Sequence, residues 1–214
     1  MSRQFFERYR TLGLTTTRTC ILREYAAFRT NRITTNWIVI SGPPHSGKTV
    51  ILNELRKQGY MVVEDLARAV IQNMMGATKS KEFVRQDYLS LQDEIRDRML
   101  EHARSLNPNE RVYWDYCLPD NLAFLYCNGW GWSRKHLEAA TMYDFAKVFI
   151  FDPIPLIHDP VADEIRVEGV KTQCRLRLTG AQVYRALGYR IARVKQRSID
   201  ERLRMVLSSN SNVT

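Results

Sequence analysis

The stretch Gly42-Pro43-Pro44-His45-Ser46-Gly47-Lys48-Thr49 directly follows the apolar run Trp37-Ile38-Val39-Ile40. It matches G-x-x-x-x-G-K-[ST], a pattern whose glycines and backbone N–H groups cradle phosphate oxygens at the start of a helix. The apolar run predicts the strand before this loop, and the pattern that begins at Val50 predicts the helix after it. We therefore expect the loop and Val50 to bind a nucleotide, although a chance match in an ordinary strand-turn-helix is the alternative.

Two side chains of the loop are expected to act on phosphate and metal. Lys48 would bridge the β- and γ-phosphates as a mobile cation, and Thr49 would offer its hydroxyl to Mg²⁺. ATP and Mg²⁺ are the expected cofactors. His45 is interpreted as a variable loop position rather than as a catalytic base.

Short apolar runs alternate with helical periods along the rest of the chain, which indicates an α/β fold with a parallel sheet covered on both faces. We predict a doubly wound, five-stranded parallel sheet of the P-loop NTPase type, kinase-like and with a helical lid. The expected strands span 37–41, 60–63, 111–115, 147–151 and 189–194. Helices are expected over 65–75, 82–106 and 199–207, and a further helix near 21–29 fits the pattern.

The 214 residues, 44% of them hydrophobic, suffice for one substantial core. We expect a basic N-terminal extension (1–36), a P-loop kinase-like domain (37–207) and a flexible tail (208–214). No segment has the length and apolarity of a membrane span. The four cysteines form no C-x-x-C pair, so reduced thiols and a cytoplasmic location are expected.

The formal net charge of +9 is concentrated near the start of the chain. Residues 1–36 contain seven arginines and two glutamates, a net charge of +5. This segment could contact a polyanion, a membrane surface or a partner protein, or it could be a solvated extension or a targeting peptide.

Asp115 ends the expected strand 111–115, at the edge of the sheet where open α/β folds bind their ligands. It is expected to hold Mg²⁺ beside Thr49, and the alternative is that it caps the following turn. The next residue is Tyr116, where motor-type ATPases commonly carry a water-activating glutamate. The guanine-reading N-K-x-D and γ-phosphate-sensing D-x-x-G patterns are absent from suitable positions. These observations favour transfer to a bound acceptor over hydrolysis.

Further candidate substrate ligands follow the second and third strands. Asp65 could accept a proton from an acceptor hydroxyl or bind a sugar hydroxyl, while Arg68 could hold an anionic part of the substrate. The alternative is that Asp65 caps a helix and pairs with Arg68 one turn later. Asp120 likewise has two interpretations, as a helix cap or as a substrate ligand.

A polar stretch over 157–178 lies where nucleotide kinases carry their lid. Arg166 is expected to stabilise charge on the transferring phosphoryl group, and Arg175 to contact the nucleotide. The alternative for each arginine is a solvated helix face.

Several of these motifs together resemble one family. They are residues 37–42, the loop 42–49, residues 59–68, Asp115 with 118–120, 188–189 and 199–202. The chain resembles small P-loop AAA-type ATPase and kinase-like proteins similar to nicotinamide riboside kinase and thymidylate kinase-like enzymes. The resemblance runs from about 37 to 207 and implies a core that binds ATP and Mg²⁺, a substrate pocket near Asp65 and Arg68, and a lid containing Arg166.

The chain departs from the family pattern at three places. The family more often has glutamate at Asp65 and arginine at Tyr116, and Pro43-Pro44-His45 replaces a more usual glycine-rich interior.

The sequence thus predicts a phosphotransferase that uses Mg²⁺-ATP and acts on a nucleoside, nucleotide or similar small hydroxyl acceptor. Two alternatives stay open. One is an NTPase or nucleotide-gated switch whose basic segment engages a partner, and the other is a protein that acts on nucleic-acid ends.

Overall fold

The computed structural model describes residues 31–78, 88–129, 131–154, 170–195 and 197–208. Its centre is a parallel sheet in the order β3-β4-β2-β6-β7. The strands are β2 (Ile38–Ser41), β3 (Met61–Val63), β4 (Val112–Asp115), β6 (Lys147–Phe151) and β7 (Ile191–Val194). The five predicted strands and their parallel arrangement are therefore confirmed.

Both faces of the sheet are buried, which explains why the strands are continuous apolar runs rather than alternating ones. Residues of β2 point alternately to two separate cores. Val39 packs with the larger hydrophobic cluster, whereas Ile38 and Ile40 pack with the smaller one. Each face therefore needs its own cover of helices.

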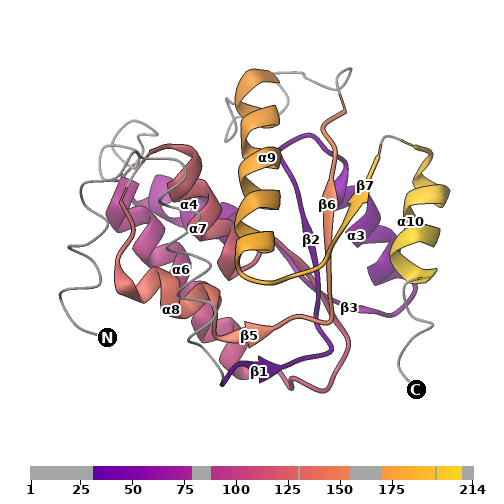
Figure 1. Cartoon of the computed structure of the whole chain (residues 1–214), viewed down its shortest axis with the longest axis horizontal. Coiled ribbons are helices and arrows are strands. Elements are labelled where there is room, and N and C mark those ends of the chain that lie inside the picture. The colour runs from indigo at the N-terminus through magenta and orange to yellow at the C-terminus, as the bar shows by residue number, and fades with distance from the viewer. Residues whose placement is uncertain (1–30, 79–87, 130, 155–169, 196, 209–214) are drawn as a thin grey trace.

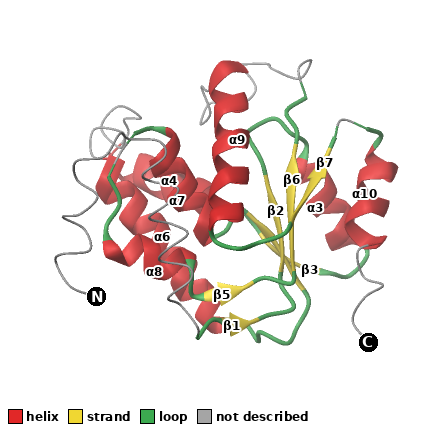
Figure 2. Ribbon diagram, viewed as in Figure 1, coloured by secondary structure: helices red, strands yellow, loops and turns green. Residues whose placement is uncertain are grey.

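The smaller cluster is covered by α3 (Lys48–Lys57) and α10 (Ile199–Ser208) (Figure 1). The larger cluster is covered by five helices, which Figure 2 shows on the opposite side of the sheet. They are α4 (Leu66–Thr78), α6 (Tyr88–Ser105), α7 (Leu118–Cys127), α8 (Arg134–Ala140) and α9 (Val170–Ala186). This three-layer arrangement is the predicted doubly wound fold.

Helix ends follow local chemistry closely. After α3, Gly59 has a positive φ of 86° and its N–H bonds to the carbonyl of Arg56, while Tyr60 N–H bonds to that of Leu55. This pair of bonds is the Schellman closure that glycine permits. At α10, Ser198 Oγ accepts a bond from Glu201 N–H at 3.2 Å, and the Glu201 carboxylate accepts from Ser198 N–H at 3.1 Å. The predicted capping box is confirmed.

Two helix boundaries differ from the expected ones or lie partly outside the described residues. Helix α4 continues through Gly76 to Thr78, because a glycine costs a helix only about 1 kcal/mol and does not by itself end it. Helix α6 is described from Tyr88, and residues 79–87 of the expected helix lie outside the described part. The expected helix near 21–29 lies outside it as well.

A second, two-stranded parallel sheet joins β1 (Ile33–Thr34) to β5 (Tyr143–Asp144). Just before β1, Arg32 donates a 2.8 Å hydrogen bond to the carbonyl of Leu187. Residues 31–36, placed by sequence in the N-terminal extension, are thus bonded to the main domain.

The expected lid falls mostly outside the described residues. Residues 155–169, which include Arg166, are not described, and residues 170–178 form the first half of α9. Among the described residues, no helix combines the length and apolarity needed to cross a membrane.

Candidate nucleotide-binding site

The loop 42–49 leaves the sheet at its middle strand, β2. From β2 the chain first builds β3 and β4 on one side and then crosses to β6 and β7 on the other. Connections that diverge in this way leave a crevice at the carboxyl ends of the strands, where ligands of open α/β folds bind. The sheet order therefore places the predicted phosphate loop at this crevice.

Two glycines of the loop occupy positions that other residues cannot take without strain. Gly42 has φ 139°, and a Cβ there would lie 2.7 Å from the carbonyl oxygen of Phe151. Gly47 has φ 78°, and a Cβ there would lie 2.8 Å from Nη1 of Arg202. The backbone of the loop is thus packed directly against β6 and α10.

Lys48 lies at the centre of the loop and is only 4% exposed. Its Nζ donates to the carbonyls of Gly42 and Pro43, both at 2.9 Å, and lies 3.4 Å from Ser46 Oγ. The ammonium also lies 5.4 Å from the centre of the Tyr116 ring, within cation–π range. The loop therefore concentrates positive charge at its centre.

The rest of the loop differs in exposure. Pro43, Pro44 and Ser46 are buried, whereas Thr49 and Val50 are exposed at the start of α3. His45 has a positive φ of 57°, and its carbonyl accepts a 3.3 Å hydrogen bond from Ile154 N–H. The loop is thereby tied to the segment after β6.

Asp115 ends β4, the strand next to β2, and pairs in register with Ile40. Its side chain is buried, with 6% exposure, and lies at the same edge of the sheet as the loop. Asp115 carboxylate and Thr49 hydroxyl oxygens are the hard ligands that Mg²⁺ prefers, so the donor chemistry fits this ion.

Tyr116 was not predicted to be a site residue. Its φ is 66°, an unusual conformation for an aromatic residue, and its N–H bonds to the carbonyl of Ile40 at 3.4 Å. This backbone brings its ring to Lys48. In the sequence, the feature that could have indicated this role is that Tyr116 directly follows Asp115.

Arg202 is a second residue whose role the sequence did not reveal. It comes from α10, is 6% exposed, and donates from Nη1 to the carbonyl of Ser46 at 3.0 Å. Its guanidinium lies 6.0 Å from the centre of the Phe151 ring, and burial lowers its pKa. The only sequence signal is an arginine one turn before the buried Val206, on the side of the helix that faces the core.

Asp120 joins three elements, one of them at Ser41, the residue directly before the loop. Its carboxylate accepts hydrogen bonds from Ser41 Oγ at the end of β2, from Tyr184 Oη of α9 at 2.6 Å, and from the N–H of Cys117 at 2.9 Å. The last bond caps α7. Burial raises the pKa of Asp120, and the hydrogen bonds oppose that shift.

The remaining predicted residues lie further from the loop. The Asp65 carboxylate accepts a 3.0 Å hydrogen bond from Arg68 N–H, and this bond caps helix α4. Asp65 lies after the carboxyl end of β3, which is separated from β2 by β4. Arg175 is exposed on α9. The structure thus places the loop, Asp115 and Asp120 on neighbouring elements, and puts Asp65 and Arg68 two strands away.

Solved structures with a similar fold include small nucleoside and nucleotide kinases. A thymidylate kinase from Ehrlichia chaffeensis has a TM-score of 0.56 and 16% identity, over 83% of this chain and 98% of that one. A deoxyadenosine kinase from M. mycoides has a TM-score of 0.51 and 14% identity, over 83% and 100%. A thymidylate kinase from Candida albicans has a TM-score of 0.51 and 12% identity, over 82% and 90%. At these identities the likeness concerns the fold.

No curated protein matches the chain. The model of one family, described as AAA domain, matches residues 37–202. The matched region begins just before β2 and ends at the buried arginine of α10. It covers most of the chain and contains the phosphate loop, Asp115, Asp120 and Arg202. The chain is therefore a member of the AAA domain family, with the fold of a small P-loop kinase.

Proposed function

We propose that this protein is an Mg²⁺-ATP-dependent phosphotransferase that acts on a nucleoside, a nucleotide or a similar small hydroxyl acceptor. The observation that carries the proposal is the presence of a buried Lys48 inside the loop together with a buried Asp115 at the end of the adjacent strand β4, where the next residue is Tyr116 rather than a glutamate. Such a site has a cation that can bind phosphate. At position 116, directly after Asp115, it has an aromatic ring where a hydrolase would carry a glutamate that activates water.

Each loop residue would have a distinct role. Lys48 exchanges its contacts with the loop carbonyls for β- and γ-phosphate oxygens, and the N–H groups at the start of α3 bind the phosphate chain. Thr49 and Asp115 would hold Mg²⁺, which neutralises charge on the phosphates when it is bound. The close packing of Gly42 against the backbone of Phe151, and of Gly47 against the side chain of Arg202, supports a fixed loop shape that would orient the γ-phosphate.

The acceptor would lie at the carboxyl edge near β3. Asp65 is the candidate base or hydroxyl ligand, Arg68 the candidate anion ligand, and Asp120, bonded to Ser41 directly before the loop, a third candidate. The fold neighbours, which include deoxyadenosine and thymidylate kinases, support a nucleoside or nucleotide as the acceptor class. Arg166 is proposed to stabilise charge on the transferring phosphoryl group, and Arg175 to contact the nucleotide.

The test is transfer of γ-labelled phosphate from Mg²⁺-ATP to a panel of nucleosides, nucleoside monophosphates and nicotinamide riboside. We expect one acceptor class to become labelled, and Lys48→Ala to remove the label. Lys57→Ala is the matched control, because this lysine lies at the other end of α3 and pairs with Glu54 at the surface. Equal loss in both lysine variants would contradict the proposed role of Lys48.

A second candidate, an NTPase switch that engages a partner, is favoured by the net charge of +5 in residues 1–36. A deletion of residues 1–30 distinguishes the two functions, since it keeps Arg32 and its bond to Leu187. A phosphotransferase keeps its transfer rate after this deletion. A switch loses partner binding and shows only release of free phosphate.

A further inference from the structure

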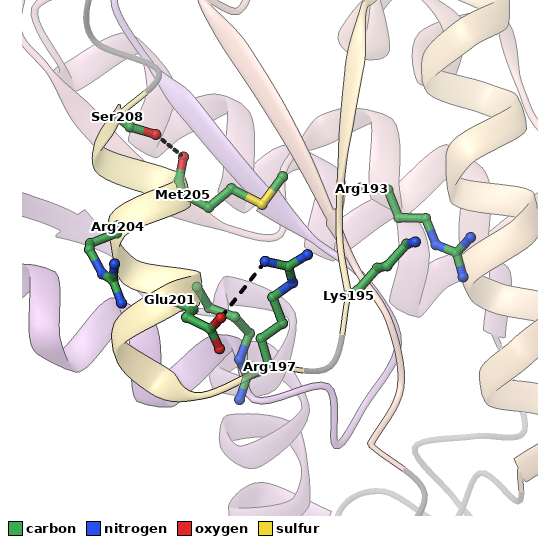
Figure 3. Close-up of a pocket in the computed structure, with 8 residues that line it drawn as sticks. Arg193, Lys195, Arg197, Glu201, Arg204, Met205 and Ser208 are labelled. Atoms are coloured by element: carbon green, nitrogen blue, oxygen red, sulfur yellow. Dashed lines mark hydrogen bonds and ion pairs between the residues drawn. The ribbon is translucent and has the colours of Figure 1, made fainter.

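A cationic cavity of about 490 Å³ lies beside α10 and the edge strand β7 (Figure 3). We call it the β7–α10 groove. Its charged lining consists of Arg193, Lys195, Arg197, Arg202 and Arg204, with Glu201 as the only acid. None of its lining residues belongs to the loop 42–49. The volume is in the range of small-molecule sites.

Two of the five cations are already paired. Arg193 donates to Asp152 at 2.8 Å, and Figure 3 shows its side chain turned away from α10. Arg197 lies 3.8 Å from Glu201, whose carboxylate also accepts bonds from Ser198. Among the residues that the structure describes, Lys195, Arg202 and Arg204 form no ion pair with a carboxylate, although Arg204 lies near enough to Glu201 to help lower its pKa. The groove therefore has an excess of positive charge.

The burial of Arg202 makes the excess of positive charge energetically unfavourable. The side chain is buried, and its Nε is a buried donor without a hydrogen-bond acceptor in the described part of the chain. Its Nη1 is held by the carbonyl of Ser46. A buried charge that meets only a carbonyl dipole and the face of the Phe151 ring is poorly compensated, and a bound anion would compensate it.

An alternative role for the groove cations is to prevent another strand from pairing with the edge strand β7, but this role explains only some of them. Cations on an edge strand discourage pairing with another strand, which accounts for Arg193 and Lys195. It does not account for Arg202 and Arg204, which project from the helix. The cations come from two different elements, the end of β7 and the helix α10, so a ligand with several phosphate groups offers partners to more of them than a single phosphate does.

We propose that the β7–α10 groove binds an oligophosphate, a chain of two or three phosphate groups, at a site separate from the phosphate loop. Guanidinium groups suit this ligand because their planar N–H forks match phosphate oxygens. Arg204 and Lys195 would hold its ends, and Arg202 would meet it from inside the fold.

The test is calorimetric titration of the full chain with sodium tripolyphosphate at physiological salt. We expect two binding events in the wild-type protein. The double variant Lys195→Ala/Arg204→Ala should weaken one event about tenfold or more, because charged hydrogen bonds are lost. Lys48→Ala should weaken the other. Lys195→Arg/Arg204→Lys should keep both, since the charges remain.

The matched control is Arg98→Ala/Arg134→Ala, which removes two exposed cations from α6 and α8, and it should keep both events. Equal weakening in this control would mean that only net charge matters and would overturn the proposal. A single binding event, or a second event that the groove variant does not change, would also overturn it. Binding of a ten-nucleotide single strand in place of tripolyphosphate would assign the groove to nucleic acid instead.

Discussion

Arg202 shows how a single side chain from the end of the chain can shape a loop more than 150 residues away. The guanidinium of Arg202 donates a hydrogen bond to the Ser46 carbonyl and so holds the phosphate loop. It lies so close to the next residue, Gly47, that a Cβ on Gly47 would not fit. The loop conformation therefore depends on α10 as well as on the loop sequence. Sequence motifs of the loop alone do not contain this information.

We predict that Arg202→Met weakens ATP binding about tenfold, because the loop loses a hydrogen bond from a charged donor, worth about 1.5–3 kcal/mol. Titration with ATP measures the change. Arg98→Met, on the exposed face of α6, is the matched control and should bind ATP like the wild-type protein. An unchanged ATP affinity in Arg202→Met, with the protein folded, would show that the loop does not need this support.

Gly42→Ala tests the close approach between the loop and β6. The new Cβ would meet the Phe151 carbonyl at 2.7 Å, in addition to the cost of a positive φ. Gly59→Ala isolates the second effect, since its φ is 86° and nothing lies within 4 Å of the added atom. We expect Gly59→Ala to cost about 1–2 kcal/mol in urea unfolding and Gly42→Ala clearly more. Equal costs would mean that the contact with β6 is unimportant.

Residues whose role depends on one local motif could be predicted from sequence. The positions of Lys48 and Asp115 at the carboxyl edge follow from a loop pattern and a strand end. The contacts of Tyr116 and Arg202 could not, because they depend on an unusual φ and on packing between distant segments.

At the scale of elements, Asp120 connects β2, α7 and α9 through its buried carboxylate. We predict that Tyr184→Phe destabilises the protein by about 1–3 kcal/mol, because a buried acceptor loses one of its donors. Denaturant unfolding measures it. Tyr60→Phe is the control, since the half-buried Tyr60 contacts the Tyr113 ring through its own ring, and it should stay within about 0.5 kcal/mol of wild type.

Helix α8 should respond to pH through His136. Its Nδ1 accepts a 3.2 Å bond from Ser133 N–H and so caps the helix, and protonation of Nδ1 would abolish this bond. Burial lowers the pKa of His136 from 6.5, Arg96 lowers it further, and Asp93 and Asp97 oppose the shift. The unfolded chain therefore binds this proton more readily than the folded protein.

It follows that stability from His136 is fully present above about pH 6.5 and is lost as the pH falls from there through the folded pKa. Unfolding at pH 7.5 and 5.5 measures this loss. His136→Asn keeps an acceptor for Ser133 but does not titrate, so its stability should fall less over the same interval. An identical fall in the two proteins would exclude His136 as the titrating group.

The core strands could be predicted from sequence, whereas helix α9 and the shortest elements could not. The five strands are apolar runs between helical segments, so the core sheet could be predicted from the chain. The two-residue strands β1 and β5 are too short to carry a periodic pattern, and α8 spans only seven residues. Helix α7 was hidden because its N-cap is Cys117, which is not a usual capping residue.

For the whole molecule, the strand order β3-β4-β2-β6-β7 fixes which candidate site residues lie next to the phosphate loop. It places the phosphate loop between a strand that ends in Asp115 and one that leads to Asp152, which pairs with Arg193. The acceptor candidates at β3 and the groove at β7 lie on opposite sides of this centre. The proposed acceptor side and the proposed anion site therefore lie on opposite sides of the phosphate loop.

The most direct test of the account is the fate of the γ-phosphate in a single turnover. Enzyme in excess of labelled Mg²⁺-ATP is mixed with a saturating pool of nucleosides and nucleoside monophosphates, and the products are separated. The account predicts that the label moves to an acceptor and that free phosphate is a minor product. Label that appears as free phosphate at the same rate with and without acceptors would contradict it.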